Sequence, residues 1–154
     1  MDKDPAFDLV EAHRYFSAHC FNAAWSIIGK ADRTREDDEA MLHAAHASAW
    51  HWAHRPDRTP TNRSVGYWQL SRVYALVGDG VSARRYAEQS MAVSQDLRPF
   101  YRGYALEALA RAELLQGNQA EGGAHLLLAR ELLAQVTDQE ERELLKADLD
   151  SLQP

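Results

Sequence analysis

Cysteine is nearly absent from the sequence: Cys20 is the only one among 154 residues. A single thiol excludes an intrachain disulfide, and such cysteine usage is typical of a reducing compartment. The opening stretch MDKDPAFDLVEA has neither the basic start nor the apolar run of a signal peptide. No apolar run approaches the roughly 20 residues that a membrane helix needs. We therefore expect a soluble, cytoplasmic protein without a membrane partner.

Positive charge is also scarce. The chain carries 17 Lys and Arg against 23 Asp and Glu, a formal net charge of −6 at pH 7. A protein whose main task is to grip nucleic acid needs a concentrated cationic surface, so this balance argues against a nucleic-acid partner. Residues 137–154 alone hold six acids against Arg142 and Lys146. We interpret this acidic end as a solubilising surface.

The motifs of familiar enzyme classes are missing. The sequence has no glycine-rich phosphate loop, no GxSxG elbow, no dinucleotide fingerprint and no HExxH pair. Cys20 has no obvious activating neighbour except His19, which points elsewhere on a helix. We therefore expect a protein without catalysis and without a cofactor.

What the sequence does contain is helix, punctuated by proline and glycine. Apolar residues return at helical spacing, and few stretches alternate as strands do. The pattern predicts an all-α protein. The expected helices cover about residues 5–28, 34–54, 64–77, 82–96, 99–116, 120–136 and 137–152.

Capping residues mark several helix ends. The predicted N-terminal caps are Asp4 before Pro5, Thr34 with Asp37, and Thr137 with Glu140. Pro56 and Pro60 cannot continue a helix, so we expect both in a loop. The pair Gly122–Gly123 weakens the sixth helix by about 1 kcal/mol per glycine, which predicts fraying or an early 3₁₀ turn there.

Two tight turns, Gly78–Asp79 and Gly117–Asn118, lie 39 residues apart. Connections this short join antiparallel helices, which predicts helical hairpins over residues 64–96 and 99–136. Their equal positions suggest an internal repeat, with matching pairs such as Leu70/Leu109 and Val93/Leu132.

The repeat resembles the tetratricopeptide repeat, with the best match over residues 65–135. The matching residues are Tyr67, Leu70, Ser71, Tyr74, Gly78, Ala83 and Ser90 in the first copy, and Leu106, Leu109, Ala110, Gly117, Leu126 and Ala129 in the second. Glu113 and Gly122 depart from the pattern. The resemblance implies one domain, residues 1–154, in which about seven helices stack as a short solenoid. Its hairpins would cover about residues 5–54, 64–96 and 99–136, with residues 137–152 as a C-terminal capping helix.

In such stacks the first helix of each pair lines a concave groove that binds a peptide or a partner helix. Carried over by position, the resemblance implies a groove lined by Trp68, Gln69, Arg72, Tyr104, Glu107 and Arg111. Each guanidinium could take a carboxylate in bidentate fashion, and the aromatics could anchor a partner. The alternative is that the arginines pair with Glu107 or Glu113. The resemblance thus implies a protein-interaction module that binds another protein or a peptide; a homo-oligomer is compatible with it.

The stretch HAAHASAWHWAHR, residues 43–55, raises a competing hypothesis of a small, possibly hydrolytic, metal-binding bundle. Its candidate ligands are His19, His43, His46 and His54, with His13 and His51 in reserve. Helical periodicity places Met41, Ala45 and Trp52 on the packing face and the histidines on a flank. Counting from the helix ends puts His13 level with His51 and His19 level with His46. The alternative is that the imidazoles simply cover a partly exposed helix flank.

Overall fold

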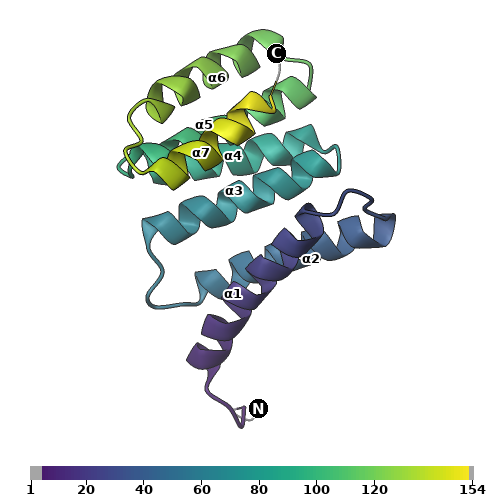
Figure 1. Ribbon diagram of the computed structural model, residues 1–154. Helices are drawn as coiled ribbons and strands as arrows, with labels where there is room; N and C mark the ends of the chain where they lie inside the picture. Colours follow the sequence, from purple (N-terminus) through teal and green to yellow (C-terminus); the bar gives the residue numbers. More distant parts are fainter. Residues whose placement is uncertain (1–4, 153–154) are drawn as a thin grey trace. The chain divides into compact units, whose positions relative to one another are not determined.

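The computed structural model describes residues 5–152, and over this range the chain is all-α, as predicted (Figure 1). The helices are α1 (Leu9–Ile28), α2 (Arg35–Ala53), α3 (Pro60–Leu76), α4 (Gly80–Ser94), α5 (Pro99–Leu115), α6 (Gln119–Leu133) and α7 (Gln139–Asp150). Successive helices pack as antiparallel pairs. None of the helices described is both long and apolar enough to cross a bilayer. The chain divides into two compact units, residues 1–59 (unit 1) and 60–154 (unit 2).

The first helix begins later than the sequence predicted. The Asp8 carboxylate accepts hydrogen bonds from the backbone N–H groups of Val10 and Glu11 at 2.8 and 3.1 Å and so caps α1. The predicted start at Pro5 is wrong, since this residue precedes the cap, and Asp4 lies outside the described residues. The Asp8 side chain stands two and three residues before these N–H groups, the spacing at which an N-cap carboxylate accepts from the unpaired donors of a first turn.

The caps of α2 and α7 follow the same chemistry. Thr34 and Asp37 form the predicted capping box, in which each side chain accepts a hydrogen bond from the other's backbone N–H at 3.1 Å. At α7 the predicted cap, Thr137, is one residue off. Asp138 takes that place and accepts from the backbone N–H of Glu141 at 2.9 Å.

Pro60 opens α3 instead of lying in the preceding loop. The prediction that this helix starts near Ser64 is therefore wrong. Proline is tolerated in a first turn because that turn does not use the missing N–H. Ser64 is instead buried in α3, where its hydroxyl lies 2.7 Å from the hydroxyl of Ser94.

Unit 1 is the hairpin of α1 and α2, and few of its side chains are buried. They are Ser17, Ala24, Met41, Ala45 and Ser48. The Ser48 hydroxyl donates to the backbone oxygen of Ser17 at 2.7 Å, and Arg55 donates to the Ser17 hydroxyl at 2.9 Å. Small side chains let two helix backbones approach closely, but they leave little apolar surface to bury.

Unit 2 contains the two predicted hairpins, α3 with α4 and α5 with α6. Gly78 and Gly117 have φ of 84° and 82°, the left-handed conformation that glycine adopts at little cost, and they make the tight turns expected at these positions. The core of unit 2 consists mainly of small and leucine side chains from α3 to α7.

The expected weakness at Gly122–Gly123 is absent, because α6 runs without a break through both residues. A Cβ on Gly122 would lie 2.7 Å from Cγ of Leu114 on α5, whereas a Cβ on Gly123 would meet nothing within 4 Å. Gly122 therefore allows α6 to approach α5 closely, and the contact with Leu114 outweighs its poor helix propensity.

The last helix, α7, packs against α5 and α6 (Figure 1). Leu145 and Leu149 are fully buried and Leu152 packs on the same core, so the predicted apolar face of this helix is confirmed. On α5, Gly103 leaves room for Leu145, whose Cδ2 would lie 2.6 Å from a Cβ at that glycine.

Candidate interaction groove

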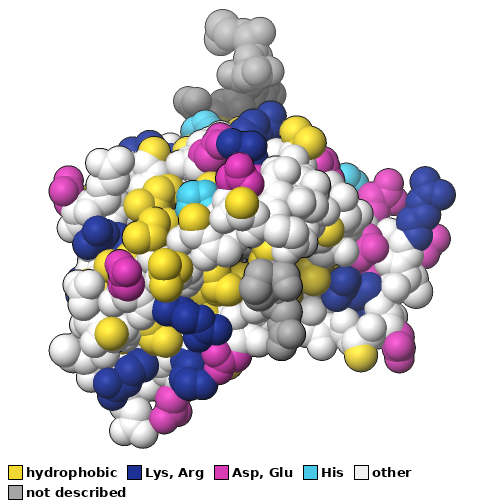
Figure 2. Space-filling view, turned by 90° about the horizontal axis from the view of Figure 1, so that it is seen from above, with side chains coloured by type: hydrophobic (Ala, Val, Ile, Leu, Met, Phe, Trp, Pro, Cys, Tyr) yellow, Lys and Arg dark blue, Asp and Glu magenta, His cyan; other side chains and the backbone are white. Residues whose placement is uncertain are grey.

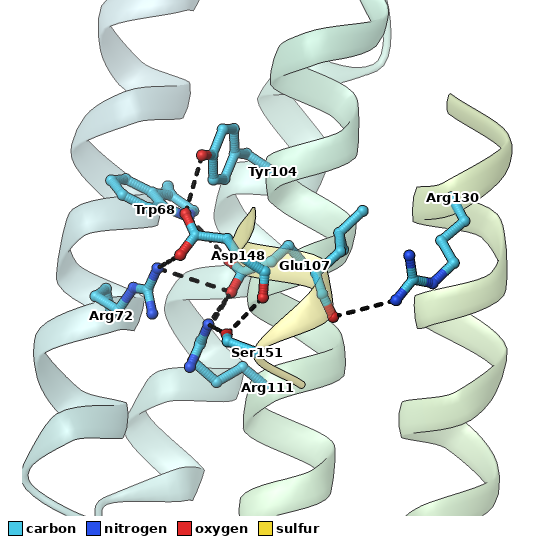
Figure 3. Close-up of polar contacts among 9 residues, drawn as sticks. Trp68, Arg72, Tyr104, Glu107, Arg111, Arg130, Asp148 and Ser151 are labelled. Carbon is cyan, nitrogen blue, oxygen red and sulfur yellow. Dashed lines mark hydrogen bonds and ion pairs between the residues drawn. The ribbon is translucent and has the colours of Figure 1, made fainter. Parts of the chain in front are cut away.

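Side chains implied by the repeat resemblance come together on facing sides of α3 and α5, inside unit 2 (Figure 3). Trp68 and Arg72 lie one helical turn apart on α3, and Tyr104, Glu107 and Arg111 follow successive turns of α5. The rings of Trp68 and Tyr104 meet edge to face at 5.1 Å between centroids. Gln69, the sixth predicted residue, is buried on α3.

Glu107 is the centre of this arrangement and is only 1% exposed. Its carboxylate accepts hydrogen bonds from the indole N–H of Trp68 at 3.1 Å and from Nε of Arg111 at 2.8 Å. Arg72 places a second guanidinium 3.9 Å away. A buried carboxylate is costly unless cations and donors surround it, and here two arginines and an indole do so. The alternative that the arginines pair with Glu107 therefore describes part of the geometry.

The other half of the arrangement comes from α7. The Asp148 carboxylate accepts from Nη2 of Arg72 at 2.7 Å and from the Tyr104 hydroxyl at 2.9 Å (Figure 3). Arg111 also donates to the Ser151 hydroxyl at 3.4 Å. Polar side chains of the predicted groove lining thus bind a helix of the same chain. Reading the acidic end only as a solubilising surface is wrong for Asp148, which is half-buried and paired.

The protonation states support this pairing. Burial by itself lowers the pKa of Arg72, but the Glu107 and Asp148 carboxylates outweigh it and the net shift is upward. Burial also raises the pKa of the Tyr104 hydroxyl, and the neighbouring Asp148 charge raises it further. Both groups remain hydrogen-bond donors at neutral pH. Together they form a site for one carboxylate.

Two further ion pairs lie at the margins of α7. Arg98 binds Glu141 through both terminal nitrogens at 3.0 and 2.8 Å, and Arg130 binds Asp150 at 3.0 Å. Exposed pairs of this kind contribute about 0–1 kcal/mol each. These pairs help to set the orientation of α7 but contribute little to its stability.

Sequence reasoning missed Asp148 and Ser151 as members of the site. A signal was present: Asp148 follows Leu145 by three residues and precedes Leu152 by four, so it shares the buried face of α7. An acid on the apolar face of an amphipathic helix indicates a buried basic partner, because an unpaired charge there is strongly unfavourable.

The predicted metal ligands do not come together. His43 is exposed, His46 is half-buried on α2, and His19 stacks on the Tyr15 ring at 5.3 Å between centroids. His54 packs on the ring of Trp50. Within residues 5–152 no group of three or more His, Cys, Asp or Glu side chains is arranged to hold a metal ion.

One expectation about the histidines is confirmed. His13 and His51 are level, and their Nδ1 atoms lie 2.9 Å apart across the hairpin. Their ring centroids are 5.0 Å apart, which places the two nitrogens between the rings as in a direct N–H···N hydrogen bond. Burial lowers the pKa of His51, and the charges of His13 and His54 lower it further.

A cavity of about 280 Å³ opens between α4, α5 and α6. It is lined by Met91, Arg102, Leu106, Leu128, Glu131, Leu132 and Gln135. Its lining is mainly apolar, with Arg102, Glu131 and Gln135 as the polar side chains.

The charge pattern agrees with the mixed composition. On the face drawn in Figure 2, basic and acidic side chains are interspersed around patches of hydrophobic side chains, with no broad area of one sign. Comparison of the chain with protein-family models, with curated proteins and with solved structures gave no match.

Proposed function

We propose that this chain is a non-catalytic protein-interaction module of the tetratricopeptide-like kind, and that the groove between α3 and α5 binds an acidic amphipathic helix of a partner protein. One observation carries the proposal: an acidic helix, α7, packs on α5 and α6 and reaches this groove with its Asp148 carboxylate, which Arg72 and Tyr104 hold. Helix-in-groove binding is a common mode of peptide recognition.

Helix α7 indicates the chemistry of the partner. Leu145 and Leu149 supply buried apolar contacts, and Asp148 supplies one carboxylate on the same face. A partner helix would repeat this pattern, with an acid three residues after one leucine. Two arginines beside one buried glutamate leave one positive charge uncompensated, so the groove favours one further negative charge and disfavours a basic helix.

A partner must displace α7, which residues 134–138 tether beside the groove. Such a short tether gives α7 an effective concentration on the order of millimolar. The partner helix therefore has to bind the open groove far more tightly than α7 does. This competition keeps the module closed to weak, non-specific acidic peptides.

The test is a labelled peptide with the sequence of residues 137–152, titrated into the full chain. Asp148→Lys in the chain sets a cation against Arg72 and Arg111 and loosens α7, so this variant should bind the peptide at least about ten-fold more tightly than the wild type does. Glu143→Lys, at an exposed position of the same helix, is the matched control and should behave as wild type.

Two results would contradict the proposal. One is equally weak binding of the peptide by the wild type and by Asp148→Lys, with circular dichroism showing that both are folded. The other is undiminished binding of a peptide that itself carries Asp148→Lys, since the groove would then not select a carboxylate.

A further inference from the structure

Unit 1 carries a continuous group of aromatic and imidazole rings that the groove does not use. The members of this ring cluster are His13, Tyr15, Phe16 and His19 on α1 and Trp50, His51 and His54 on α2. Neighbouring centroids lie 4.2–6.5 Å apart, so every ring touches at least one other. Stretches that are far apart in the sequence thus form one surface.

Much of the ring cluster faces solvent. Tyr15 is 62% exposed, Trp50 55% and Phe16 42%. The contact between α1 and α2, in contrast, buries mainly serine and alanine side chains. More aromatic surface lies outside this hairpin than within it, and exposed contiguous aromatic patches of this kind mark interaction sites.

The rings are also held in place before any partner arrives. His13 is bonded to His51 and stacked on His54 at 5.0 Å between centroids, and Trp50 packs against all three imidazoles. Side chains that are already ordered lose little rotamer entropy on binding, so the same contact area gives a tighter complex.

The charges beside the ring cluster are paired within the hairpin. Arg14 binds Glu11, and Arg55 binds Asp57 at 2.7 Å. These two pairs therefore add no net charge beside the rings. A strongly acidic or basic partner gains nothing from such a surface, whereas an identical surface meets no like-charge repulsion and offers rings to stack on.

We propose that the ring cluster is a self-association surface, on which the α1–α2 hairpin of a second copy of this chain packs through the same residues. A two-fold dimer uses one patch twice and needs it to be self-complementary, which a neutral surface of stacked rings satisfies. The inference is independent of the groove, because it concerns unit 1 alone.

The hydrogen bond between His13 and His51 makes this surface sensitive to pH. One ring must donate and the other accept, so the pair cannot keep its geometry when both carry a proton at Nδ1. Acidification also places positive charge on His51 of both copies at once. The carboxylates of Glu11 and Asp57 are already paired with Arg14 and Arg55, so they do not offset this added positive charge. We therefore expect the dimer to weaken in acid.

Sedimentation of the full chain over a concentration series tests the proposal. Tyr15→Gln and Trp50→Gln should each weaken self-association by about thirty-fold, the effect of removing an aromatic hot spot. Leu127→Gln, at a position of α6 that is 62% exposed, is the matched control and should leave the dimerisation constant within about two-fold. For the wild type, lowering the pH from 7.5 to 5 should weaken the dimer by about ten-fold or more.

Several outcomes would overturn the inference. A wild type that stays monomeric up to about 1 mM at pH 7.5 has no such interface. A dimer that survives Tyr15→Gln and Trp50→Gln but is lost with Leu127→Gln uses another surface. Because both ring positions are exposed, circular dichroism should show that both variants are folded. If one variant loses helix, the other variant still provides the test.

Discussion

The two units differ in where they place charged and aromatic side chains. Unit 2 encloses charge: Glu107 and Glu113 are at most 2% exposed, and its exposed large hydrophobic side chains are all aliphatic. Unit 1 buries no carboxylate and presents its rings, with Phe7, Tyr15, Phe16, Trp25 and Trp50 all exposed among the described residues. Buried ion pairs fix one geometry, whereas exposed rings offer contact area to another surface.

Neighbouring elements explain the difference. Each buried glutamate of unit 2 lies on α5, which packs against four other helices and so has donors on several sides. Glu113 accepts from Asn118 at 2.6 Å and pairs with Arg84 at 3.1 Å. The hairpin of unit 1 has only two helices to supply partners, and small residues fill the contact between them. We therefore expect unit 2 to respond most to changes of buried charge and unit 1 to changes of pH.

The largest expected effect is that of Glu107→Gln. The amide keeps the volume but leaves the guanidinium of Arg111 without its buried carboxylate and Arg72 with only Asp148. We expect unfolding in urea to lose about 3–5 kcal/mol. Glu88→Gln removes an exposed helical ion pair with Arg84 and should cost no more than about 0.5 kcal/mol. A loss below 1 kcal/mol for Glu107→Gln would mean that the buried charge does not hold unit 2 together.

Next in size is Gly122→Ala. The added Cβ would meet Leu114 at 2.7 Å, so the substitution should destabilise unit 2 by about 1–3 kcal/mol although alanine is the better helix former. Gly123→Ala is a matched control in the same turn, with open space around its Cβ, and should stabilise by about 0.5–1 kcal/mol. Thermal unfolding of both variants gives the comparison, and equal shifts would refute the packing argument.

A smaller effect is expected in unit 1 for Ser48→Ala. This change removes the buried hydrogen bond to the Ser17 backbone oxygen and should cost about 0.5–1.5 kcal/mol. Amide hydrogen exchange within α1 and α2 would detect it locally. Ser26→Ala, where the exposed hydroxyl only bonds one turn back to Asn22, should leave exchange unchanged. Faster exchange in α3–α6 with none in α1 would contradict the assignment of this bond to unit 1.

The smallest effect is a pH dependence confined to unit 1. Burial and the charges of His13 and His54 lower the pKa of His51 from 6.5, so the unfolded chain binds the proton more readily. Stability should therefore be full above pH 6.5 and decline as the pH falls through the lowered pKa of His51. His51→Phe should flatten the curve. NMR signals of the indole N–H groups separate Trp50 from Trp68 of unit 2, which should not respond in this range.

Most of the fold followed from periodicity and caps, because helix spacing and glycine turns are local signals. Pro60 was misplaced since a proline ends one helix as readily as it begins the next. Arg72, Tyr104 and Arg111 were expected on one face from the repeat spacing, and the structure brings them together around Glu107 and Asp148. Asp148 was not, because the crossing of α7 over α5 is a tertiary relation that no local pattern contains. His13 and His51 were placed level correctly, and His19 stacks on Tyr15 of its own helix.

The matching turns at Gly78 and Gly117 have a consequence for how such a chain can grow. Both leave their helices with nearly the same backbone angle, so a second copy of residues 79–117 inserted after Gly117 would join without a new kind of turn. The longer chain would carry one more hairpin between Arg72 and α7. Arg111 stands 39 residues after Arg72, so after such an insertion the original Arg111 would stand as many helices before α7 as Arg72 does here. Duplication within unit 2 could thus lengthen the molecule while preserving its carboxylate site.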